Sequence, residues 1–383
     1  MQHEEYLIPI GPYHPVLHEP EYFAVTLEGE KVINVDLNLG YHHRGIEKIA
    51  ATKGNVYQSL FTVERTCGIC GHTHTTNFCQ AFEKALGLEV PMRGLYIRTI
   101  MFELERLHSH LLWFAILAYQ IGFETAFMHT MADREIVMDL VEKISGNRVH
   151  YSINTIGGSR RDITEEMKNE ILNGLKELEK RWKVKSEIFR TDSSINKRIE
   201  DVGVLTKEKA LKYGVVGPTA RGSGVKIDVR KDLQHAAYGE VDFKVITENR
   251  GDNRARMLVR MLEIYESIEI IRQLLDKMPI GPINTGMRYL EYKPTEVTSF
   301  VEAPRGENFH FYKIGKDRIE RLRIRVPTYA NLFALKEMLI GYSLADIPPT
   351  LASIDPCFSC TDRLIVKDSD KGKCNVIKID DLW

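Results

Sequence analysis

Two short cysteine motifs carry the clearest chemistry in this sequence. Cys67 and Cys70 form one Cys-x-x-Cys pair near the N-terminus, and Cys357 and Cys360 form a second pair near the C-terminus. A Cys-x-x-Cys turn places two sulfur atoms at the spacing of two ligands of one metal ion, and it occurs in zinc, iron-sulfur and redox sites. If both pairs bind one metal centre, the whole chain must fold around it.

Two ordinary explanations compete with a catalytic centre. A structural zinc usually holds cysteine pairs within a few tens of residues, because the metal replaces a core that is too small to form by itself. This chain has 383 residues, 43% of them hydrophobic, and needs no such support. A thioredoxin-like dithiol explains only one pair. Arg65, His74 and Asp355 flank the two motifs and favour a reactive site over a scaffold.

The composition excludes several classes of function. Lys and Arg number 52 against 53 Asp and Glu, so the charge does not indicate nucleic acid as a partner. Six cysteines, four of them in ligand-type pairs, suit a reducing compartment, and Cys79 and Cys374 have no partner motif. The N-terminus does not read as a signal peptide, and no stretch approaches the roughly 20 apolar residues that span a bilayer. Any connection to a membrane is therefore expected through partner subunits.

The elements that must position the cysteines are predicted to be mainly helical. Strands are expected over 6–40, including a hairpin over 22–37 with a glycine turn. Helical periodicity follows over 45–290. The long helices are expected over residues 92–118, 125–145, 163–189 and 252–278. Long antiparallel helices pack as a bundle, so the centre of the molecule should be helical.

The remaining segments complete a mainly α (α+β) fold. A β ribbon is expected over 295–326, and a C-terminal metal-binding segment over 327–383 begins with a short helix. The glycine-rich segment 214–224 is predicted to be a loop; a phosphate-binding loop is disfavoured because no Gly-Lys-Ser/Thr ending follows. We therefore expect one large domain over 1–383, in which a central bundle of long helices carries small peripheral antiparallel β-sheets.

Taken together, the two motifs resemble a known pair of signatures. The pattern Arg-x-Cys-Gly-x-Cys-x-x-x-His at 65–74, with Asp-Pro-Cys-x-x-Cys at 355–360, resembles nickel-iron hydrogenase large subunits. This resemblance implies a nickel-iron centre whose iron carries carbon monoxide and cyanide. It makes Cys67 and Cys357 terminal nickel ligands and makes Cys70 and Cys360 bridges to iron. It also implies heterolytic cleavage of H2, with Cys357 as the first proton acceptor.

The same resemblance gives roles to five further residues. Glu19 aligns with an N-terminal glutamate that accepts the next proton. Arg305 matches an arginine held over the metals, where it polarises a substrate or binds cyanide, and Pro304 would shape that pocket. Asp355 would anchor the arginine, and His74 would donate a hydrogen bond to a bridging sulfur. Without the cysteines these would read as a solvated carboxylate, a surface arginine and a packed histidine.

Two positions depart from the family pattern. Glu47 matches a glutamate that in many relatives binds a second metal, magnesium or iron, together with a histidine three residues past the last cysteine. Arg363 stands at that histidine position, and arginine cannot ligate a cation. We therefore expect Glu47 to pair with Arg363, with a second metal at Glu47 as the alternative. Ser109 falls where oxygen-exposed relatives carry an aspartate.

Several segments also resemble the large subunit of the quinone module of respiratory complex I. They are residues 11–15, 41–45, 157–162, 217–224 and 302–307. That subunit lacks the nickel cysteines, and this chain has all four. The combination resembles the membrane-bound, energy-converting (Ech-like, group 4) hydrogenases. It implies electrons from reduced ferredoxin, a small subunit with a four-iron cluster, further iron-sulfur subunits, and ion-translocating membrane subunits at the cytoplasmic face of the membrane.

Three functions remain open from the sequence. The first is the catalytic subunit of a nickel-iron hydrogenase. The second is a quinone or sulfur-compound reductase subunit of the complex I lineage without a functional nickel-iron site, which His14, His42 and His43 favour. The third is a non-catalytic scaffold with a four-thiolate zinc site, which would have little use for Arg305 or Glu19.

Overall fold

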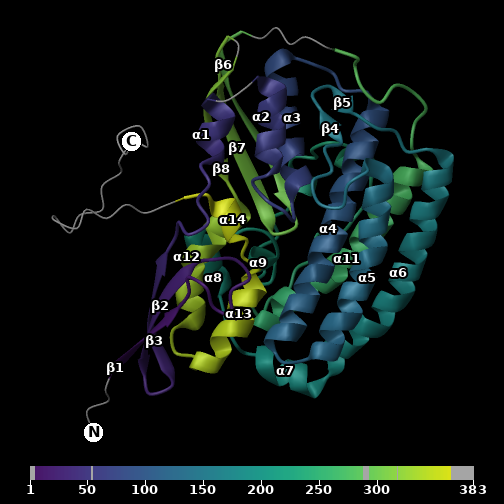
Figure 1. The fold of residues 1–383 in the computed structure, drawn as a ribbon. Helices are drawn as coiled ribbons and strands as arrows, with labels where there is room; N and C mark the ends of the chain where they lie inside the picture. Colours follow the sequence, from purple (N-terminus) through teal and green to yellow (C-terminus); the bar gives the residue numbers. More distant parts are fainter. Residues whose placement is uncertain (1–4, 53–54, 288–292, 317, 364–383) are drawn as a thin grey trace.

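The computed structural model describes residues 5–52, 55–287, 293–316 and 318–363. Long helices gather on one side of the molecule, and two small three-stranded sheets lie on the other (Figure 1). This confirms the predicted mainly α fold with peripheral antiparallel sheets. The predicted C-terminal segment 327–383 is described as far as Arg363, so Cys374 lies outside the described residues.

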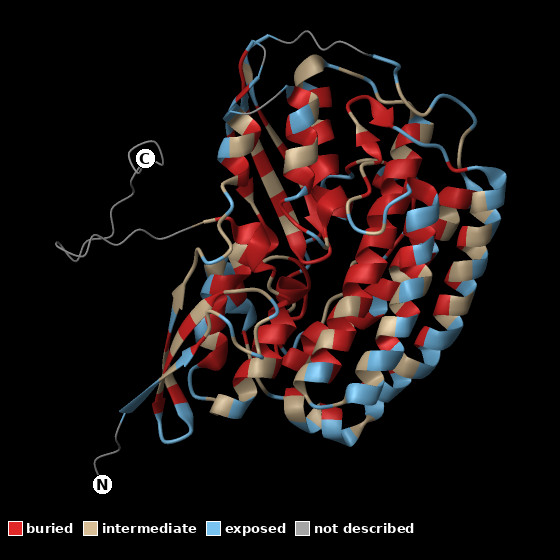
Figure 2. Ribbon diagram, viewed as in Figure 1, coloured by how far each residue is buried: buried red, intermediate tan, exposed pale blue. Residues whose placement is uncertain are grey.

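Four long helices form the bundle: α4 (Met92–Gln120), α5 (Glu124–Ser145), α6 (Glu165–Thr191) and α11 (Asn253–Asp276). They confirm the four helices predicted from the sequence. Helix α4 packs against both α5 and α11, and buried residues occur all round it, whereas α6 buries only one stripe. Exposed residues accordingly lie along the outer faces of α5 and α6 (Figure 2). The bundle therefore places α4 at the centre of the molecule.

The first sheet consists of β1 (Glu5–Ile10), β2 (Tyr22–Glu28) and β3 (Lys31–Asn38), all antiparallel. The predicted hairpin is β2–β3, with Val25 opposite Val35. Alternate side chains of β2 are buried, as expected for a sheet with one covered face. They belong to the same hydrophobic cluster as residues of α8 (Lys207–Tyr213), α12 (Pro327–Leu339) and α13 (Ile347–Ile354).

The second sheet consists of β6 (Thr295–Ala303), β7 (Gly306–Ile314) and β8 (Ile319–Arg325). The β ribbon predicted over 295–326 is this three-stranded antiparallel sheet. Ala303 pairs with Gly306, so Pro304 and Arg305 form a two-residue turn. Helices α1 (Ile46–Thr52) and α3 (Gly71–Leu86) pack on this sheet, and α2 (Val56–Glu64) packs on both helices.

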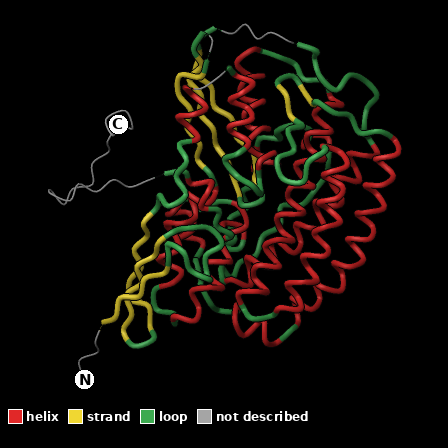
Figure 3. Tube along the Cα trace, viewed as in Figure 1, coloured by secondary structure: helices red, strands yellow, loops and turns green. Residues whose placement is uncertain are grey.

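Short elements connect these layers. They are α7 (Ser193–Ile199), α9 (Gly217–Arg221), α10 (Val229–Asp232), α14 (Phe358–Thr361), β4 (Asn154–Thr155), β5 (Gly158–Ser159) and two 3-10 turns, Tyr238–Glu240 and Leu344–Asp346. Helix α9 corrects the prediction of a plain loop over 214–224. Loops fill the region between the bundle and the sheets (Figure 3). None of the helices in the described part of the chain has the length and apolar character needed to cross a bilayer.

Candidate metal centre

The two Cys-x-x-Cys pairs, which are distant in sequence, meet in the interior. The Sγ atoms of Cys67 and Cys357 are 3.6 Å apart, and those of Cys357 and Cys360 are 2.9 Å apart. The sulfurs of Cys70 and Cys360 also lie within 4.8 Å of each other. All four cysteines are buried and none forms a disulfide. Four sulfurs in one buried cluster form a site for a thiophilic metal.

Local hydrogen bonds set the orientation of each pair. Cys70 directly precedes α3, and the backbone N–H groups of Ile69 and Cys70 donate to Cys67 Sγ at 3.3 and 3.1 Å. Such donors stabilise negative charge on the sulfur. In the second pair, the N–H of Cys357 donates to Thr328 Oγ1 at 3.0 Å. Hydrogen bonds from Cys360 and Cys67 lower the pKa of Cys70 to about 7, which favours a thiolate in the cluster.

Arg44 joins the two cysteine segments, a role that the sequence did not reveal. Its guanidinium donates to the carbonyl oxygens of Arg65, Thr66 and Ser359 at 2.8, 2.8 and 2.9 Å. Its backbone N–H donates to Asp362 Oδ1 at 2.7 Å. The motif at 41–45 was the available signal, but the bonding partners lie in segments that only the fold brings together.

Arg305 extends from the β6–β7 turn toward the second cysteine pair. Its Nη2 donates to Asp355 Oδ1 at 2.8 Å, and its Nε donates to the Asp355 carbonyl at 2.9 Å. Its Nη1 donates to Ser109 Oγ at 3.0 Å. Burial lowers the pKa of Arg305, but Asp355 and Cys357 outweigh it, so the guanidinium stays charged. Pro304 is buried in the same turn.

His74 lies on α3 beside the cysteines. One of its ring nitrogens is within 4.8 Å of the sulfurs of Cys70 and Cys360. Its Nδ1 contacts His310 Nε2 at 3.1 Å and the Asn308 side-chain amide at 3.3 Å, whereas its Nε2 has no partner among the described residues. Burial lowers the pKa of His74 to about 4, so the ring is neutral. With Nδ1 as the acceptor, Nε2 carries the ring proton. This N–H can donate a hydrogen bond to a sulfur or a bound ligand.

Glu19 reaches the same cluster from the loop between β1 and β2. Its Oε1 lies 3.9 Å from Cys357 Sγ and accepts a hydrogen bond from Ser359 Oγ at 2.6 Å. Ser359 Oγ is itself 3.2 Å from Cys357 Sγ, so one hydroxyl bridges the thiol and the carboxyl group. Burial, followed by the nearby Cys357, raises the pKa of Glu19. The pair therefore has the geometry of a short proton path.

Glu47 pairs with arginine, as expected. Its Oε1 accepts from Arg363 Nη2 at 2.8 Å, and its Oε2 accepts from Arg323 Nη1 at 2.6 Å. Ile324 N–H donates to Oε1 at 2.7 Å. Both carboxylate oxygens are thus engaged by cations or an amide, which leaves little negative charge to bind a second metal.

We predict that Mg²⁺ does not stabilise the wild-type protein through Glu47. A cation that bound only the folded state would raise the melting temperature by mass action, but the two guanidinium groups already neutralise this carboxylate. Thermal unfolding of the purified complex should therefore give the same midpoint in millimolar Mg²⁺ and in EDTA. A rise with Mg²⁺ that Glu47→Gln removes would contradict the pairing.

A cavity of about 570 Å³ opens beside the cluster. Glu19, Arg305 and Asp355 line it, whereas Pro304 is not among its lining residues. Most other lining side chains are apolar: Val16, Leu17, Ile69, Leu112, Ile116, Phe127, Met131, Leu351 and Phe358. A small uncharged molecule can therefore reach the charged end of the cavity without meeting another ion.

Comparison with known proteins identifies the family of this chain. The family "Nickel-dependent hydrogenase" matches residues 44–175, and "Respiratory-chain NADH dehydrogenase, 49 Kd subunit" matches 120–294 and 285–363. The membrane-bound hydrogenase subunit alpha of Pyrococcus furiosus is 43% identical over 381 residues, which cover 95% of this chain and 89% of that protein. The chain belongs to the nickel-iron hydrogenase large-subunit family. The carbon monoxide-induced hydrogenase of Rhodospirillum rubrum is also similar, at 42% identity over 362 residues, 94% of this chain and 99% of that protein.

Two further relatives are not named as hydrogenases. A chain in the solved structure of the membrane-bound sulfane sulfur reductase, an archaeal respiratory membrane complex, has a TM-score of 0.89 and 31% identity. The match covers 95% of this chain and 100% of that one. One subunit of the F(420)H(2) dehydrogenase of Methanosarcina mazei is 37% identical over 371 residues, 95% of this chain and 99% of that protein. Family membership therefore places this chain among oxidoreductase subunits, and the choice of reaction depends on the site.

Proposed function

We propose that this chain is the catalytic large subunit of a membrane-bound, energy-converting nickel-iron hydrogenase. It interconverts H2 with protons and electrons, the electrons coming from reduced ferredoxin through iron-sulfur clusters of partner subunits. The reaction is coupled to ion translocation by membrane subunits, and the chain sits peripherally at the cytoplasmic face. The observation that carries this proposal is the buried cluster of four cysteine sulfurs, on which Glu19 and Arg305 converge.

The donor set fits a nickel-iron centre. Nickel and low-spin iron both favour thiolates, and Cys67, Cys70, Cys357 and Cys360 would hold the two metals. The charged guanidinium of Arg305 can donate to cyanide on the iron, and the Nε2–H of His74 can donate to a sulfur. A structural zinc would use the sulfurs alone and would leave these buried groups without a purpose.

The residues of this chain would carry the proton. When bound, a nickel-iron centre supplies the redox chemistry that splits H2 heterolytically or forms it from protons and electrons. A proton on Cys357 Sγ can pass to Ser359 Oγ at 3.2 Å, and the Ser359 hydroxyl can pass its own proton to Glu19 Oε1 at 2.6 Å. The raised pKa of Glu19 makes it able to hold this proton nearer neutral pH. His18, the neighbouring residue, is exposed and lines the same cavity.

Partner subunits would supply the electrons. Besides the four clustered cysteines, the described part of the chain contains only Cys79, which is buried in α3. One isolated thiol cannot hold an iron-sulfur cluster, which needs about four protein ligands. A small subunit with a four-iron cluster would therefore dock near the cysteines, and further iron-sulfur and membrane subunits would complete the complex.

The first test is elemental analysis of the complex purified from its native host without oxygen. We expect nickel and iron together in stoichiometric amounts, infrared bands from carbon monoxide and cyanide on the iron, and evolution of H2 from reduced ferredoxin. Zinc alone would favour the scaffold. Turnover of a quinone or sulfur compound without any H2 exchange would favour the second function, which the relationship to the sulfane sulfur reductase keeps open.

A further inference from the structure

The glycine-rich segment 214–224 lies directly against the turn that carries Arg305. A Cβ atom at Gly217, the first residue of α9, would be 2.2 Å from the carbonyl oxygen of Arg305. A Cβ at Gly306, on the other side, would be 2.6 Å from the backbone nitrogen of Gly217. Both glycines also have positive φ, +65° and +129°. Only two glycines allow the backbones of α9 and the β6–β7 turn to touch in this way.

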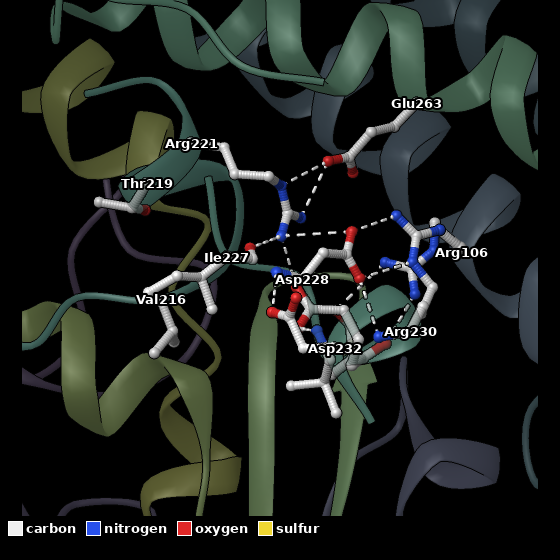
Figure 4. A network of polar contacts seen from close by, with 12 residues as sticks. Arg106, Val216, Thr219, Arg221, Ile227, Asp228, Arg230, Asp232 and Glu263 are labelled. Atoms are coloured by element: carbon white, nitrogen blue, oxygen red, sulfur yellow. Dashed lines mark hydrogen bonds and ion pairs between the residues drawn. The ribbon is translucent and has the colours of Figure 1, made fainter. Parts of the chain in front are cut away.

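The other end of α9 holds the strand that leads into the turn. Arg221 is fully buried, and its Nη1 donates to Glu302 Oε1 at 2.7 Å while its Nε donates to Glu263 Oε1 at 2.9 Å. Glu302 precedes Arg305 by three residues, at the end of β6. Figure 4 shows Arg221 between Glu263 on α11 and the buried acidic group that includes Asp228. Helix α9 therefore contacts the turn through its first residue and the strand before it through its last.

A second arginine holds the backbone of the same strand. Arg106 on α4 donates through Nη2 to the carbonyl of Glu302 at 2.6 Å and through Nη1 to that of Ala303 at 3.2 Å. Arg106 also contacts Glu103, and Glu103 binds Arg230. Arg230 in turn binds Asp228 (Figure 4). Because these charges are buried and paired, moving one of them leaves another uncompensated. The network therefore resists displacement of the turn.

Helix α12 links the glycine-rich segment to the cysteines. The side-chain oxygen of Asn331 accepts from the N–H of Val216, the residue before Gly217, at 2.9 Å. One turn earlier on the same helix, Thr328 Oγ1 accepts from the N–H of Cys357 at 3.0 Å. Helix α12 therefore holds both the residue before Gly217, which contacts the Arg305 turn, and Cys357, a proposed nickel ligand.

We propose that helix α9 is a positioning element, in which Gly217 and Arg221 fix the 303–306 turn so that the Arg305 guanidinium stays over the metal centre. This inference rests on the proposed hydrogenase function, which gives Arg305 its task. A displacement of about 1 Å in a catalytic group can cost about 10²-fold in rate.

Gly217→Ala and Gly214→Ala form a matched pair of test variants. Gly214 ends α8 with a φ of +64°, almost that of Gly217, but a Cβ there would meet nothing within 4 Å. Both variants carry similar backbone strain, and only Gly217→Ala pushes against Arg305. In the assembled complex, Gly217→Ala should lower kcat by about 10- to 100-fold with nickel content unchanged. The infrared bands of the iron ligands should shift in this variant, and Gly214→Ala should keep the wild-type rate and bands.

Wild-type bands and rate in Gly217→Ala, or equal losses in both variants, would overturn the inference. If Gly217→Ala fails to assemble, Asn331→Ala removes the bond to Val216 without a clash; shifted bands would support the inference and unchanged bands would overturn it. A wild-type complex without nickel would overturn the proposed function instead. In that case a cryo-EM structure of the variants still tests the inference, through a lengthened Arg305–Asp355 contact, now 2.8 Å.

Discussion

Replacing Cys357 by serine is expected to abolish both evolution and uptake of H2. A serine hydroxyl keeps the size of the side chain but does not ionise near neutral pH, so it would neither ligate a soft metal nor carry the proton as a thiol does. Cys357 is also the sulfur that contacts both Cys67 and Cys360 and lies beside Ser359. We expect the rate of H2 turnover to fall by roughly 10³-fold or more, because removing one member of a catalytic group that acts as a unit removes most of the activity of the whole group.

Cys79→Ala is the matched control for this variant. Cys79 is equally buried, lies on α3 behind the first cysteine pair, and belongs to neither metal-binding group of the described residues. Its loss should cost some stability through a small cavity but should leave nickel content and turnover unchanged. The measurements are nickel content and H2 exchange in the purified complex. Full turnover by Cys357→Ser would remove the hydrogenase assignment and leave the reductase alternative.

The sequence predicted the parts of this protein that depend on local pattern. The long helices and the β2–β3 hairpin follow from periodicities of 3.6 and 2 residues, and the cysteine pairs from their spacing. The sequence also placed Glu47 with Arg363, because arginine cannot replace a metal-binding histidine. Such inferences need only the chemistry of neighbouring residues or the pattern of a family.

The contacts that the sequence could not supply are those between distant segments. Arg44 holds two cysteine segments together through three backbone carbonyls. Every residue has a backbone carbonyl, so the sequence does not indicate which ones an arginine binds. Ser359 lies inside the second cysteine motif, yet its bridging position depends on where the loop with Glu19 runs. The glycine-rich segment likewise gained its short helix, and its contact with Arg305, from tertiary packing. These features depend on the three-dimensional placement of elements, which local pattern does not determine.

Glu19→Gln is expected to separate proton transfer from assembly of the metal centre. Glutamine retains the shape of the side chain and can still accept the hydrogen bond from Ser359, but it cannot take up and release a proton. Loss of a positioned acid or base usually costs about 10²- to 10⁴-fold, so H2 evolution and the exchange of D2 with water should fall by that factor. Nickel content and the infrared bands should remain near those of the wild type, since Glu19 is not a metal ligand in this proposal.

The neighbouring carboxyl group Glu21 provides the control that decides this prediction. It is buried two residues away, and burial raises its pKa to about 7, but no sulfur contact is found for it within the described residues. A general effect of neutralising a buried carboxyl group in this loop would slow Glu21→Gln as much as Glu19→Gln. A specific proton path through Ser359 would slow only Glu19→Gln, because only Glu19 accepts the Ser359 hydroxyl beside Cys357. Ser359→Ala should then show a smaller loss in the same direction, since Glu19 Oε1 remains 3.9 Å from the thiol and a water molecule can replace the hydroxyl.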